Sequence, residues 1–73
     1  MLLSLLKRGQ KGIVSKIDHP TLRIEALRFG IGVGQSIECC EVIPAGPIII
    51  RKGNQEIAIG RELANVITIS KQV

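Results

Sequence analysis

A short amphipathic stretch that runs into closely spaced glycines and then into a strand dominates the fold prediction for this chain. The stretch covers residues 20–29, and the glycines Gly30, Gly32 and Gly34 precede an alternating segment at residues 35–42. Glycine commonly ends a helix because it adopts positive φ without a Cβ penalty. The pattern therefore predicts a helix inserted between two strands, and we place the function on this insertion.

The remaining strand signals are short and separated by turn residues. The predicted strands are residues 13–17, 35–42, 48–50, 55–60 and 66–70. Residues 61–64 predict one helical turn before the last strand. Short strands with glycine turns in a chain of this length favour a closed or partly closed barrel. The predicted structural turn residues are Gly12, Gly30, Gly34, Gly46 and Pro47.

The composition predicts a single small domain over residues 1–73 with an aliphatic core. Hydrophobic residues make up 45% of the chain, and Phe29 is the only aromatic. Base stacking and proline-rich peptide grooves depend on aromatic side chains. These two function classes are therefore excluded.

The basic residues outnumber the acidic ones, and the formal net charge is +4. Lys and Arg are scattered along the sequence, with no run longer than a pair, such as Lys7-Arg8. An ordinary solvated surface is the favoured interpretation. A phosphate-binding face or an acidic protein partner stays open, since positive charge speeds both encounters.

Cys39 and Cys40 are adjacent in a predicted strand. Neighbouring strand residues point to opposite faces, so we expect one buried thiol, one exposed thiol and a β-bulge nearby. Free thiols indicate a reducing compartment and a cytoplasmic location. A redox or metal-linked role of the pair stays open.

The leucine-rich opening, residues 1–6, is too short for a membrane span and lacks the basic start and cleavage site of a signal peptide. We expect it to lay its leucines against one end of the barrel.

No catalytic or metal-binding constellation is present in the sequence. His19 is the only histidine, and it lies next to the predicted helix start, where a surface or capping role is expected. Asp18 or Thr21 would supply the capping oxygen. The glycines follow a helix and do not precede one, which excludes a phosphate cradle. We therefore expect no enzyme activity, no metal site and no cofactor.

The order of these signals resembles the FeoA family. The resemblance rests on Gly9, Gly12 and Val14, on a helix carrying Arg23 and Leu27, and on four further motifs. These motifs are the Phe29-Gly30-Ile31-Gly32-Val33-Gly34 passage, the Gly46-Pro47 turn, the 55–60 strand and Ala64 with Ile67. The family implies an SH3-like five-stranded β-barrel, mainly β, with a short helical insertion between strands 1 and 2.

The resemblance also implies a cytosolic accessory or regulator of FeoB, the ferrous iron transporter with a GTPase domain. The protein would then reach the membrane only through this partner. A homo-oligomer stays open. Two alternatives stay open. One is an SH3-like regulatory module related to the C-terminal domain of iron-dependent repressors. The other is a small basic nucleic-acid-binding barrel, which the absence of clustered Lys and Arg disfavours.

The helix carries the predicted partner-binding residues. Leu22 and Phe29 are expected to face the barrel. The residues expected to face outward are Arg23, Ala26, Leu27 and Arg28. Apolar anchors beside arginine are typical of compact protein interfaces. The alternative is that the helix only plugs the open end of the barrel.

Overall fold

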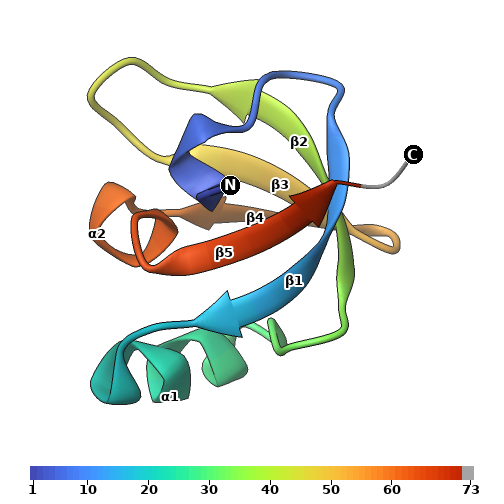
Figure 1. The fold of residues 1–73 in the computed structure, drawn as a ribbon. Helices are drawn as coiled ribbons and strands as arrows, with labels where there is room; N and C mark the ends of the chain where they lie inside the picture. The colour runs from blue at the N-terminus through green and yellow to red at the C-terminus, as the bar shows by residue number, and fades with distance from the viewer. Residues whose placement is uncertain (72–73) are drawn as a thin grey trace.

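The computed structural model describes residues 1–71, which form one five-stranded antiparallel sheet with short helical segments (Figure 1). The elements in chain order are η1 (Leu3–Leu5), β1 (Lys11–Ile17), α1 (Pro20–Arg28), β2 (Ser36–Val42), β3 (Ile48–Lys52), β4 (Gln55–Ile59), α2 (Arg61–Ala64) and β5 (Ile67–Lys71). The predicted five strands, the helix after the first strand and the helical turn before the last are confirmed.

The strand order is β4-β3-β2-β1-β5, and the sheet curls around its core in the SH3-like manner (Figure 1). Strand β2 is the middle strand, and β1 pairs with β2 near its start and with the edge strand β5 along its length. The backbone before η1 borders the other side of β5, where the Ile69 nitrogen donates to the Met1 carbonyl oxygen at 2.6 Å. Since no ladder joins β4 to β5 within residues 1–71, the barrel is partly open.

The core is entirely apolar among the described residues and is built mostly from isoleucine and leucine. Its members are Leu3, Leu6, Val14, Ile17, Leu22, Ala26, Ile31, Ile37, Cys39, Ile48, Ile50, Ile57, Ile59, Leu63, Ala64, Ile67 and Ile69. Leu3 and Leu6 bring the leucine-rich opening onto the barrel, as the sequence predicted. Alternation along each strand therefore places the aliphatic side chains on one side of the sheet.

Strand β2 carries the predicted irregularity at the cysteine pair. The register with β3 shifts between Cys39 and Glu41, which is a β-bulge. Cys39 is fully buried, Cys40 is half-buried, and both thiols are free. The expected buried thiol is therefore Cys39, whereas Cys40, expected to be exposed, is partly covered.

Gly12, predicted in a turn, lies inside β1 instead. The turn is at Arg8 and Gly9, where Gly9 adopts a φ of 88°. A Cβ at Gly12 would meet the side chain of Ile69 and lie 2.9 Å from the Ser70 carbonyl oxygen. Glycine is needed here because β1 and β5 approach closely, which a local sequence pattern does not reveal.

Arg61 ties three segments together at one end of the molecule. Its Nε donates to the Gly46 carbonyl oxygen at 2.8 Å, and its Nη2 donates to the Ile43 carbonyl oxygen at 3.0 Å. Its Nη1 donates to the Ser4 carbonyl oxygen at 3.4 Å. One guanidinium thus joins α2, the β2–β3 loop and η1, which lie close together in Figure 1.

Candidate partner-binding surface

Helix α1 begins at a histidine cap. His19 is the residue before the first helical turn, and its Nδ1 accepts a hydrogen bond from the Leu22 backbone nitrogen at 3.2 Å. Pro20 follows at the first helical position, where its missing N–H leaves no donor unsatisfied. The capping role expected for His19 is therefore observed, and the expectation that Asp18 or Thr21 supplies the capping oxygen is wrong.

The helix ends in a Schellman motif around Gly30. The Gly30 nitrogen donates to the Leu27 carbonyl oxygen, and the Ile31 nitrogen donates to the Ala26 carbonyl oxygen, both at 3.0 Å. Gly30 adopts a φ of 75°, which a side chain would disfavour. The motif reverses the chain, and Ile31 becomes fully buried.

The side of α1 that faces the sheet consists of small and medium aliphatic residues. Leu22 and Ala26 are both buried in the core. The expectation that Ala26 faces outward is therefore wrong, since its exposed fraction is zero. Phe29, expected to face the barrel, is 42% exposed. It is the C-terminal cap of α1 with φ −87° and ψ 1°, so helical spacing no longer sets its direction.

The outer side of α1 and its exit loop expose a group of large apolar side chains, which we call the α1 surface. Ile24 and Leu27 are each 60% exposed, and Val33 in the loop is 66% exposed. Together with Phe29 and Arg28 they make up this surface. An open hollow of about 330 Å³ follows the same side of the helix and is lined by Thr21, Ile24, Glu25, Arg28 and Phe29.

The predicted arginines differ in their surroundings. The Nη2 of Arg23 donates to the Ile17 carbonyl oxygen at 3.3 Å, so Arg23 is tied back to the end of β1. The side chain of Arg28 makes no hydrogen bond or ion pair within residues 1–71 and stays available beside Leu27. Sequence reasoning missed Ile24, Phe29 and Val33 as parts of the surface, although Ile24 precedes Leu27 by one helical turn.

The surface is held in place by the neighbouring hairpin and by β1. The Nζ of Lys52, at the end of β3, donates to the Gly30 carbonyl oxygen at 2.6 Å. The Gly34 nitrogen donates to the Val14 carbonyl oxygen at 2.7 Å. These bonds fix the loop on which Val33 lies.

Titratable groups form no site of another kind within residues 1–71. No group of three or more His, Cys, Asp or Glu side chains is arranged to hold a metal ion in this range. Burial raises the pKa of the Cys39 thiol, and the neighbouring Cys40 raises it further. The hydrogen bond to Glu56 raises the pKa of Arg51. Among the described helices, none has the length and apolar character of a membrane span.

Comparison with known proteins assigns the family. The FeoA domain model matches residues 1–71. A crystal structure of an iron uptake regulatory protein (FeoA) has a TM-score of 0.91 and 36% sequence identity, covering 99% of this chain and 97% of that one. The FeoA protein from Chlorobium tepidum has a TM-score of 0.83 and 27% identity, covering 100% of this chain and 71% of that one. No curated protein sequence matches the chain significantly.

A manganese-dependent transcriptional repressor shares the fold, with a TM-score of 0.89 and 19% identity over 99% of this chain and 41% of that one. At this identity the likeness establishes a common SH3-like fold alone. The family model spans nearly all of the chain, and the FeoA crystal structure agrees in sequence, length and fold. This chain therefore belongs to the FeoA family, which is associated with ferrous iron transport.

Proposed function

We propose that this protein is a non-catalytic, cytoplasmic accessory of ferrous iron uptake that binds the cytosolic, GTPase-bearing part of the FeoB transporter through the α1 surface. Membership of the FeoA family supports the pathway. The interaction is supported by one observation above all, namely the exposed apolar side chains gathered on a helix whose other side is already buried. Ile24, Leu27 and Phe29 do not contribute to the core.

The chemistry of the α1 surface suits a protein partner. Exposed aliphatic and aromatic side chains gain free energy when they are removed from water. Arg28 adds a charged donor that has no partner of its own within residues 1–71. Arginine beside large apolar groups is common among the residues that dominate binding energy. The net charge of +4 accelerates association with an acidic partner.

The test measures binding of the purified FeoB cytosolic domain by calorimetry, with nucleotide turnover followed in parallel. Leu27→Asp and Arg28→Glu are each expected to weaken binding at least tenfold while leaving the fold intact. Leu5→Asp is the matched control, because Leu5 is 60% exposed, like Leu27, but lies in η1 and not in α1. Unchanged affinity of both α1 variants, or an equal loss in the control, would remove the α1 surface from the proposal.

A further inference from the structure

The basic side chains fall into two groups according to whether they already have a partner. Lys16 and Arg51 form ion pairs with Asp18 and Glu56. Three others donate to backbone carbonyl oxygens; these are Arg23, Lys52 and Arg61. The side chains without a hydrogen bond or ion pair in the described part of the chain are Lys7, Arg8, Lys11, Arg28 and Lys71.

Most of these unpaired cations gather where β1 begins and β5 ends. Lys7 and Arg8 lie in the segment before β1, and the Lys7 backbone N–H donates to the Gln10 Oε1 at 2.8 Å. Lys71, at the end of β5, is the cross-strand neighbour of Gly12. We call Lys7, Arg8 and Lys71 the basic corner.

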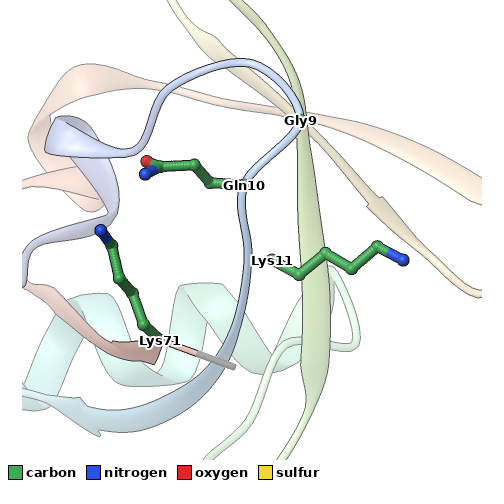
Figure 2. A pocket seen from close by; sticks show the side chains of 4 residues that line it. All are labelled: Gly9, Gln10, Lys11 and Lys71. Atoms are coloured by element: carbon green, nitrogen blue, oxygen red, sulfur yellow. The ribbon is translucent and has the colours of Figure 1, made fainter. Parts of the chain in front are cut away.

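One member of the basic corner, Lys71, lines an open hollow of about 330 Å³ together with Gly9, Gln10 and Lys11. Figure 2 shows that Gln10 and Lys71 extend to the same side of β1, whereas Lys11 extends to the other side. Glu38 is the cross-strand neighbour of Lys11 and offsets its charge. The cross-strand neighbour of Lys71 is Gly12, so no carboxylate lies opposite Lys71.

Exposed apolar side chains adjoin the basic corner. Leu5 precedes Lys7 by two residues and is 60% exposed. Met1 is 45% exposed and is held against Ile69, two residues before Lys71, by a backbone hydrogen bond of 2.6 Å. The corner thus combines cations that have no partner in residues 1–71 with exposed aliphatic groups.

We propose that the basic corner docks on the surface of an anionic phospholipid membrane. Unanchored lysines suit a fluid, delocalised negative surface, whereas a defined carboxylate or phosphate site favours a fixed guanidinium fork. Leu5 and Met1 suit the boundary between headgroups and acyl chains. These aliphatic groups would contribute little to binding a nucleic acid, and no aromatic side chain is present in the corner for base stacking.

The basic corner and the α1 surface lie at opposite ends of β1 (Figure 1). Lipid binding at one end therefore leaves the other end free for a protein. A direct lipid contact of the basic corner is independent of FeoB binding at the α1 surface. The resemblance to the FeoA family implies membrane contact only through the partner. A few cations give weak attraction, so the contact gains strength when a membrane-embedded partner already holds the protein nearby.

The test is sedimentation of the full chain with phosphatidylcholine vesicles that contain a quarter phosphatidylglycerol, at millimolar lipid and low salt. We expect partition onto these vesicles, none onto pure phosphatidylcholine, and release by added salt. Lys7→Ala combined with Arg8→Ala is expected to lower the partition coefficient about 25-fold, since each cation near such a surface contributes about fivefold. Lys16→Ala combined with Arg28→Ala is the control, with the same change in net charge at the α1 end.

Three outcomes would overturn the proposal. One is an equal loss in the control variant, which would mean that only net charge matters. Another is no partition onto the anionic vesicles, or equal partition onto neutral ones. The third is binding to duplex DNA or to the FeoB cytosolic domain that depends on Lys7 and Arg8 while vesicle binding does not. The α1 variants are assayed for FeoB binding without lipid. If the basic corner does not bind vesicles, the proposed FeoB interaction is therefore unaffected.

Discussion

Two identical side chains at neighbouring positions have different chemistry in this protein. Cys39 is buried among the aliphatic residues of the core, whereas Cys40 lies at the bulge and is half-buried. Burial opposes ionisation of the inner thiol and raises its pKa above the ordinary value of 9.0. The outer thiol is therefore the one available to solvent reagents, and the inner one acts as a small apolar side chain.

The raised pKa of Cys39 predicts a dependence of stability on alkaline pH. The unfolded chain loses this proton more readily than the folded one, so the stabilisation is complete below pH 9.0 and is lost as the pH rises toward the folded pKa. The free energy of unfolding, measured by urea titration between pH 7 and 10.5, should fall less steeply in Cys39→Ala than in the parent. Cys40→Ala should keep most of the parent's decline, because burial is the larger cause of the raised pKa of Cys39 and the charge of Cys40 the smaller. An equally steep decline in Cys39→Ala would contradict the assignment.

At the scale of elements, glycines and alternation were enough to predict the helix and the strands. The stop at Gly30 and the inward Ile67 and Ile69 follow from local rules of spacing and φ. The direction of Phe29 could not be predicted in this way, because the helix ends one residue before it. Ile31 takes the buried position instead, through the Schellman bond to Ala26.

The need for glycine at position 12 also could not be predicted from the neighbouring sequence. Its neighbours across the strand pair, Ile69 and Ser70, come from the far end of the sequence. By contrast, the capping role of His19 agrees with its position just before the helix, and the burial of Ala26 agrees with its spacing of four residues from Leu22. Of the partner-binding residues expected from the sequence, Leu27 and Arg28 alone belong to the α1 surface.

The contact between β1 and β5 gives a prediction at this scale. Gly12→Ala should destabilise the protein by about 1–3 kcal/mol, because the new Cβ is forced against the Ile69 side chain and the Ser70 carbonyl oxygen. Gly60→Ala is the matched control, since no atom lies within 4 Å of its Cβ position and its φ is −61°. Thermal and urea unfolding of both variants would check this, and equal stabilities would contradict the close approach.

At the scale of the whole molecule, Arg61 holds together segments that are distant in sequence. It bonds to Ser4, Ile43 and Gly46 from α2 and so connects the N-terminal segment with the β2–β3 loop. Elements this short gain little from their own hydrogen bonds. Their positions therefore depend on such links and on burial of residues such as Leu3 and Leu63.

Arg61→Ala should lower the free energy of unfolding by about 2 kcal/mol, because the partly buried carbonyl oxygens of Gly46 and Ser4 lose a charged donor. Arg61→Lys should be little more stable than Arg61→Ala, since a single ammonium cannot replace a planar guanidinium that donates to three acceptors. In Arg51→Ala, the control, an exposed ion pair with Glu56 is lost at a cost below about 1 kcal/mol. A smaller loss in Arg61→Ala than in Arg51→Ala would show that the three bonds do not stabilise the fold.

The same SH3-like fold occurs in FeoA proteins and in a manganese-dependent transcriptional repressor. A shared fold does not decide function, which depends on the groups presented by each surface. In this protein the two groups for which we propose functions are the apolar residues on the outer side of α1 and the cations at the start of β1. They are separated by the length of one strand, β1.

The hydrogen bond from Lys52 to Gly30 links the β3–β4 hairpin to the C-terminal end of α1. An ammonium at the negative end of a helix favours the helical conformation, so displacement of one part strains the other. A protein that grips α1 would consequently pull on Gly53 and Asn54, at the hairpin tip. A protein bound at α1 would therefore act, through this one bond, on the hairpin that leads into β4, the edge strand of the sheet.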